Sequence, residues 1–152
     1  MATTISGPQI HKRAGRSIGP GWQRLLAAGA GLVLAATVAN VLIAMALRNG
    51  LGVPRAFTPL STPAVATFTV VGMIGATLVF AWVARVQANP RRTFVLIAMA
   101  GLIVSWLPDL AIWATGVFPG TTTTGIISLM ALHVVAAGLT VGILLRFGLT
   151  SE

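Results

Sequence analysis

The chain has 152 residues, of which 56% are hydrophobic and only 8% are charged, whereas about a quarter of the residues of an ordinary soluble domain carry charge. This composition excludes a typical soluble protein, and a mean hydropathy of +0.92 predicts a membrane protein with one compact domain. The net charge of +8 is better explained by basic segments at an anionic membrane surface than by nucleic-acid binding, so we expect no nucleic-acid partner.

A basic segment, residues 1–24, precedes the first apolar run. It contains Gly7-Pro8, Gly19-Pro20-Gly21 and four cationic side chains, Lys12, Arg13, Arg16 and Arg24. This composition predicts a flexible cytoplasmic arm rather than a folded domain. The apolar run that follows is about 19 residues long before its first cleavage-like motif, whereas a signal peptide has about 7–15. We therefore interpret it as an anchored helix.

Four hydrophobic runs are each long enough to cross a hydrocarbon core of about 30 Å as a helix. Their ranges are 25–47, 65–86, 93–115 and 125–145, and a short tail, 147–152, follows the last one. The connections contain Asn-Gly, Asn-Pro and Pro-Gly pairs, which are typical of turns. Uninterrupted runs of this length favour helices over barrel strands. The predicted fold is an all-α membrane protein, an antiparallel bundle of four transmembrane helices.

The cationic residues indicate an orientation for this bundle. Eight of them fall in the arm, in the second connection or after the last span: Lys12, Arg13, Arg16, Arg24, Arg85, Arg91, Arg92 and Arg146. Only Arg48 and Arg55 fall on the opposite side. Because cytoplasmic loops are enriched in Lys and Arg, we expect both termini in the cytoplasm and the loops 48–64 and 116–124 outside.

Small residues recur at every fourth position on three spans. They are Ala27, Gly31, Ala35 and Ala39, then Gly72 and Ala76, then Gly138 and Gly142. Such stripes let helices approach closely in lipid. They could form a homo-oligomer interface, above all through Gly138 and Gly142, or they could pack helices within the bundle. We expect the second, because four helices with short loops must pack on one another.

Asp109 is the only acidic residue before Glu152, and it lies within the third span. A carboxylate there costs about 2.5–3.5 kcal/mol on insertion scales, so Asp109 should face the bundle and have a polar partner. Polar residues on the other spans share its depth in the outer half, namely Asn40, Thr67, Thr69 and His133. We predict that Asp109 lies within hydrogen-bonding reach, directly or through one water, of His133, Arg55 or Asn40.

The third span has further features around this carboxyl. Pro108 lacks a backbone N–H, so we expect a kink and an unpaired carbonyl at Val104. Ser105, Asp109 and Trp113 recur at four-residue spacing and share a face, and Trp106 lies one turn before Asp109. Together these groups predict the wall of a polar pocket. Trp113 has a second interpretation, as part of the aromatic belt at the membrane surface.

The first external loop offers a second partner for Asp109. This loop contains Arg55 and three prolines, and Phe57 and Leu60 could anchor it on the bundle. It could cover the outer mouth with Arg55 pointing inward. Alternatively, Arg55 is a solvated surface residue.

His133 could be a hydrogen-bonding residue or a ligand of haem or a chlorophyll-type pigment. The other histidine is His11, in the basic arm, so we exclude bis-histidine haem within one chain. A metal ion would have only His133, Asp109 and Asn40 as ligands, without metal-ligand spacing. We expect no metal site, and the sequence indicates no particular cofactor.

Four short motifs carry a resemblance to a known family. They are Pro54-x-x-Phe57-x-Pro59-Leu60, Arg92-x-Phe94, Ser105-x-x-Pro108-Asp109 and Met130-x-x-His133. In their order the chain resembles a family of small four-helix bacterial integral membrane proteins of unknown function, over about residues 25–146. The resemblance implies a bacterial plasma (inner) membrane location and implies no activity.

Three classes of function remain open. The chain lacks cysteine and shows no paired acids within the membrane, no phosphate-binding loop and no catalytic triad, so we expect a protein that is not an enzyme. We favour an accessory protein, a small subunit of a larger membrane complex or a binding module. The alternatives are a protein that binds a lipophilic, quinone-like or pigment molecule, and a proton-coupled carrier that uses Asp109 and His133 as a relay.

Overall fold

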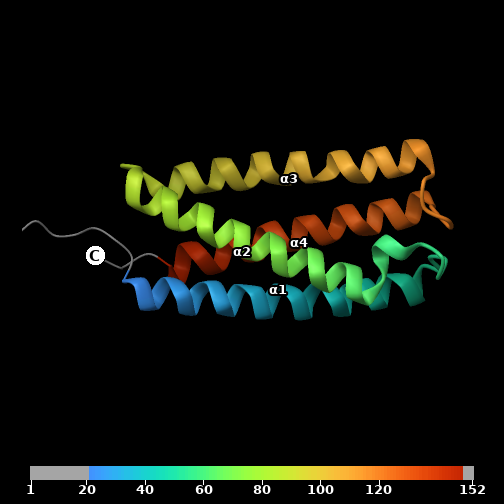
Figure 1. Ribbon diagram of the computed structural model, residues 1–152, viewed down its shortest axis with the longest axis horizontal. Coiled ribbons are helices and arrows are strands. Elements are labelled where there is room, and N and C mark those ends of the chain that lie inside the picture. The colour runs from blue at the N-terminus through green and yellow to red at the C-terminus, as the bar shows by residue number, and fades with distance from the viewer. Residues whose placement is uncertain (1–20, 149–152) are drawn as a thin grey trace, which may run out of the picture.

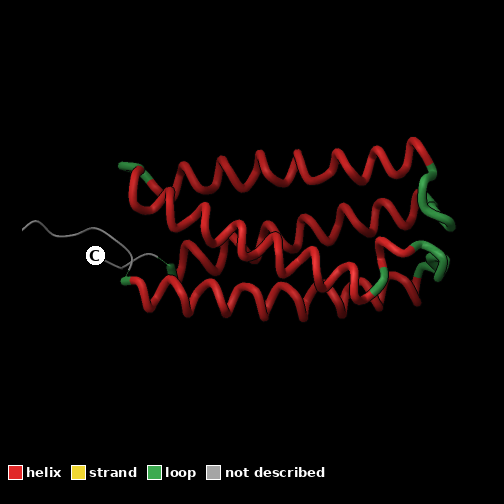
Figure 2. Tube along the Cα trace, viewed as in Figure 1, coloured by secondary structure: helices red, strands yellow, loops and turns green. Residues whose placement is uncertain are grey.

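The computed structural model describes residues 21–148, which form four long antiparallel helices (Figure 1). They are α1 (Trp22–Gly50), α2 (Thr62–Val86), α3 (Pro90–Thr115) and α4 (Thr123–Phe147), with a short 3-10 helix, η1 (Thr58–Leu60), before α2. No strand occurs in this part of the chain (Figure 2). Each long helix has the length and apolar composition needed to cross a membrane. The predicted fold class, a membrane protein with an all-α four-helix bundle, is therefore confirmed.

Each predicted span lies inside one helix, and the helices extend up to three residues further. The reason is that polar and proline residues can occupy the first helical turn without losing a hydrogen bond. Residues 22–24, which we assigned to the flexible arm, accordingly begin α1. The rest of the predicted arm, residues 1–20, and residues 149–152 of the predicted tail lie outside the described residues.

The four helices are unequally packed. α1 contacts both α2 and α4, and α4 also contacts α3 (Figure 1). α3 lies at the margin of the bundle, where only Phe94 and Asp109 are buried among its residues. Asp109, which carries a carboxyl group, is thus one of the two buried residues of α3.

Two apolar clusters hold the bundle together, one at each end. At the end where α1 begins, Phe80 and Phe94 meet edge to face with ring centroids 4.9 Å apart, beside Leu25, Leu32 and Leu144. At the opposite end, the loop before α2 inserts Phe57 and Leu60, which are 0% and 1% exposed, against residues of α4. The loop therefore folds over this end of the bundle through the two apolar side chains that the sequence indicated.

The glycines in the stripes of small residues do not pack the bundle, contrary to our expectation. Gly31, Gly72, Gly138 and Gly142 are exposed, and a Cβ atom added at any of them would meet nothing within 4 Å. The close approach occurs instead at Gly29, where an added Cβ would lie 2.6 Å from the Cγ2 of Thr77 on α2. Spacing revealed the small residues but not the direction they face.

Candidate functional site

Asp109 and His133 form a polar pair between α3 and α4. The carboxyl-bearing residue is only 5% exposed, and its Oδ2 lies 3.2 Å from Nδ1 of His133. The contact predicted from their shared depth is therefore present. It places the one acidic side chain of the described residues against the one histidine that they contain.

A third group, the backbone of α4, decides where the imidazole proton lies. Nδ1 of His133 is also 3.0 Å from the carbonyl oxygen of Leu129, one turn earlier. A carbonyl oxygen can only accept, so Nδ1 must carry the hydrogen. This N–H is directed at Leu129, and Oδ2 of Asp109 lies beside it without a well-directed hydrogen bond. The contact between the two side chains is therefore mainly electrostatic.

The far nitrogen of the ring faces away from this arrangement. The His133 side chain is 37% exposed, and Nε2 has no hydrogen-bond partner among residues 21–148. His133 lies ten residues into α4, or about 15 Å along the helix, well within the depth of a hydrocarbon core. Since an unpaired polar group is unfavourable there, Nε2 is available to a group from outside the chain.

Asn40 does not join this pair, and the prediction that it could was wrong. Its Nδ2 donates to Oγ1 of Thr69 at 3.1 Å, which links α1 to α2. The expected polar layer is thus two separate pairs, because α1 and α3 are not neighbours in the bundle. Thr67, expected in the same layer, is exposed.

The predicted pocket wall on α3 is only partly present. α3 passes through Pro108 as one helix and shows no sharp bend in Figure 1, so the predicted kink was wrong. Pro108 and Val104 are both exposed, so the carbonyl that Pro108 leaves without an N–H partner lies on the outer side of α3. Ser105 donates to the carbonyl of Leu102 in its own helix at 2.7 Å, and Trp113 is 55% exposed. Trp113 therefore matches its alternative interpretation as a surface aromatic residue.

Trp106 retains a place near the pair. It lies one turn before Asp109, and its Nε1 is buried without a hydrogen-bond partner in the described part of the chain. An indole N–H donates only, so Trp106 offers an unused donor on α3, in addition to the unpaired Nε2 of His133 on α4.

Arg55 is not a partner of Asp109. It is exposed, and its backbone carbonyl accepts a hydrogen bond from Nη2 of Arg48 at 2.6 Å. The loop reaches the bundle through Phe57 instead, so the arginine remains on the outer surface. The Leu129 carbonyl is the part of the site that the sequence interpretation missed, although polar side chains on a helix can bond the carbonyl four residues earlier.

With the geometry of the pair described, comparison with known proteins gives the family. A family model matches residues 20–149, which include all four helices and both members of the pair. The chain belongs to a family of unknown function (DUF6069). Membership in this uncharacterised family agrees with the resemblance seen in the sequence. Comparison with curated proteins and with solved structures finds no match.

Proposed function

We propose that this protein is a non-catalytic accessory protein of a larger membrane complex, which it binds through the α3–α4 surface at His133. The observation that carries the proposal is the unpaired Nε2 of His133 at bilayer depth. The buried carboxyl of Asp109 and the Leu129 carbonyl fix the ring through its other nitrogen. A carboxylate in this position also makes an imidazole a better acceptor. A hydrogen-bonding side chain from a partner helix would satisfy the exposed nitrogen.

A photo-crosslinking experiment tests this proposal in cells of the native host. Benzoylphenylalanine is placed at Leu110 and at Val134, which are exposed next to each member of the pair, and at exposed Leu34 of α1 as the control. We expect one discrete protein adduct from the first two positions and none from Leu34. Replacing His133 with asparagine, which keeps a donor toward Leu129 but removes Nε2, should lower the yield several-fold. Lipid adducts alone, or protein adducts that His133→Asn leaves unchanged, would contradict the proposal.

The buried Nε1 of Trp106 favours a second candidate, a binding protein for a lipophilic molecule with hydrogen-bonding oxygens, such as a quinone or a pigment. Its N–H has no partner in the described residues and could donate to such an oxygen. Native mass spectrometry of the protein extracted in mild detergent would then show a bound species of low mass. Trp106→Phe, which keeps a ring and removes the donor, should abolish that species; its persistence would contradict this candidate.

A proton-coupled carrier has less support than either binding function. A relay needs successive titratable groups along a path, and apart from Arg85, which stays protonated, the four predicted spans hold only Asp109 and His133. Both belong to the same contact, so neither provides a second step. We therefore favour binding over transport.

The proposal includes an orientation of the bundle in the membrane. In a bacterial inner membrane, the arginines at the end where α1 begins would face the cytoplasm, as the bias of cationic residues favours. The chain has no cysteine, so single cysteines can be introduced without background. Thr58→Cys, in the loop before α2, should react with an impermeant maleimide on intact spheroplasts. Gln87→Cys, between α2 and α3, should react only after lysis, and the reverse pattern would show the opposite orientation.

A further inference from the structure

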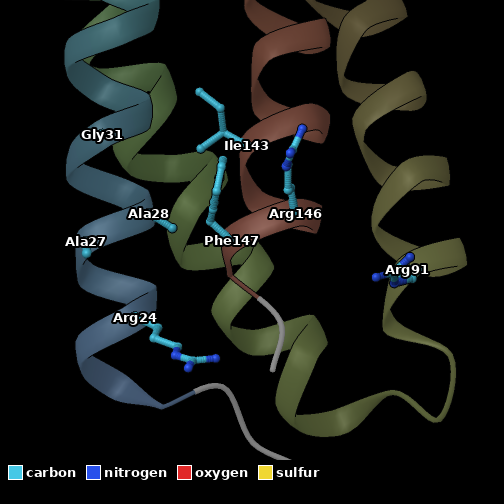
Figure 3. Close-up of a pocket in the computed structure, with 8 residues that line it drawn as sticks. All are labelled: Arg24, Ala27, Ala28, Gly31, Arg91, Ile143, Arg146 and Phe147. Carbon is cyan, nitrogen blue, oxygen red and sulfur yellow. The ribbon is translucent and has the colours of Figure 1, made fainter. Parts of the chain in front are cut away.

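A hollow of about 570 Å³ opens at the end of the bundle where α1 begins and α4 ends. Its rim carries one arginine from each of three helices, Arg24 of α1, Arg91 of α3 and Arg146 of α4 (Figure 3). Side chains in Figure 3 show Arg24 extending from α1 toward α4. The hollow is within the size range of about 300–1,000 Å³ that is usual for ligand sites.

The positive charge of this rim is not balanced by the described part of the chain. Asp109 is the only acidic side chain in residues 21–148, and it is paired with His133. Arg24 and Arg91 also lie in the first turns of α1 and α3, where no acidic residue occurs. The positive end of a helix dipole is unfavourable for a cation and favourable for an anion. An anion between these arginines would therefore relieve both sources of repulsion.

The type of side chain indicates the kind of anion. A guanidinium group presents paired N–H donors that match two oxygens of a phosphate. The guanidinium carbon of Arg146 lies 5.6 Å from the ring centroid of its neighbour Phe147, a cation–π contact that supports the side chain at the rim. The three arginines therefore give the rim of the hollow donors that suit a phosphate group.

The rest of the hollow is apolar and extends from the arginines along the helices, away from this end of the bundle. It is lined by Ala27 and Gly31 of α1 and by Ile143 of α4. Gly31 is seven residues beyond Arg24, or about 10 Å along the helix, and a Cβ added there would meet nothing within 4 Å. A basic rim joined to an open apolar wall matches a molecule with a phosphate at one end and a hydrocarbon chain at the other.

We propose that this hollow is a binding site for an anionic phospholipid, independent of the function proposed for His133. The headgroup phosphate binds at the basic rim that Arg24, Arg91 and Arg146 form, and an acyl chain lies along Ala27, Gly31 and Ile143. Basic pockets between transmembrane helices bind such headgroups in other membrane proteins. A second copy of this chain is a poorer occupant, because a two-fold contact here would bring two sets of arginines together.

Native mass spectrometry of the full-length protein with added phosphatidylglycerol or phosphatidylcholine tests the site. We expect preferential retention of phosphatidylglycerol. Arg24→Gln, Arg91→Gln and Arg146→Gln should each lower its affinity about fivefold, because one cation near a membrane surface contributes about 1 kcal/mol. Arg92→Gln is the matched control, since Arg92 is exposed beside Arg91 but does not line the hollow. An equal loss for Arg92→Gln would overturn the proposal.

A second pair of variants separates a lipid from a free anion. Gly31→Leu fills the apolar part of the hollow without changing charge, and Gly72→Leu adds the same side chain at an equally open position on α2. We expect only Gly31→Leu to reduce phosphatidylglycerol binding. Displacement of the lipid by millimolar inorganic phosphate, with Gly31→Leu without effect, would show an anion site that is not a lipid site. A dimer that dissociates in Gly31→Leu, with no change in lipid binding, would show that a second copy covers this face.

Discussion

Replacing His133 with leucine is expected to destabilise the bundle by about 3 kcal/mol, more than replacing Asp109 with leucine. Loss of the imidazole leaves Asp109, which is 5% exposed, without the one ion-pair partner that it has in residues 21–148. Loss of the carboxyl, in contrast, leaves His133 bonded to the carbonyl of Leu129 and partly exposed. Hydrogen bonds between helices in membranes contribute only about 0.6–2 kcal/mol. Most of the difference therefore comes from the unpaired buried acid.

Steric trapping or reversible unfolding in detergent would measure these free energies. His133→Leu combined with Asp109→Leu should regain most of the stability lost in His133→Leu, because replacing both members of a buried pair by apolar residues is often nearly neutral. Asp109→Asn should be milder than Asp109→Leu, since it keeps a polar group of nearly the same size beside His133. Thr115→Leu, at an exposed position of the same helix, is the control. If Asp109→Leu lost as much stability as His133→Leu, the buried carboxyl would not be the source of the effect.

The sequence predicted the Asp109–His133 contact for a reason that holds in any bilayer. A lone carboxyl group is so unfavourable in hydrocarbon that it requires a polar partner, and few polar groups shared its depth. Depth alone also suggested Asn40, which the structure pairs with Thr69 instead. The height of a residue in the membrane follows from counting along the helix, whereas its neighbour depends on the order of helices around the bundle. That order is set by packing of the whole chain.

The same distinction explains the other differences. Pro108 was expected to bend α3, but it lies on the exposed side of a helix at the margin of the bundle. The stripes of small residues predicted close packing of helices, yet Gly138 and Gly142 are exposed. Almost every face of these helices is apolar, because lipid and protein interior accept the same side chains. Hydrophobic periodicity therefore predicts the number and length of the helices but little about their inward faces.

Gly29 should be the glycine whose replacement most disturbs the packing of α1 on α2. Gly29→Ala is expected to cost about 1–3 kcal/mol through steric strain, even though alanine is favoured over glycine within a helix by about 1 kcal/mol. The added Cβ would lie 2.6 Å from Cγ2 of Thr77 and 3.3 Å from its Oγ1. Thr77 cannot turn away freely, because its Oγ1 donates to the carbonyl of Met73 at 2.8 Å. The two helices would have to separate.

The substitution Thr77→Ala provides the decisive comparison, because it removes the two atoms nearest to the added methyl group. In detergent unfolding, Gly29→Ala together with Thr77→Ala should regain most of the stability that Gly29→Ala alone loses. Gly31→Ala, two residues along the same helix and facing open space, should be neutral or slightly stabilising. If Gly29→Ala behaved like Gly31→Ala, α1 and α2 would not be in close contact at this point. If Thr77→Ala failed to restore stability, the strain would arise from the backbone of α2 rather than from its side chain.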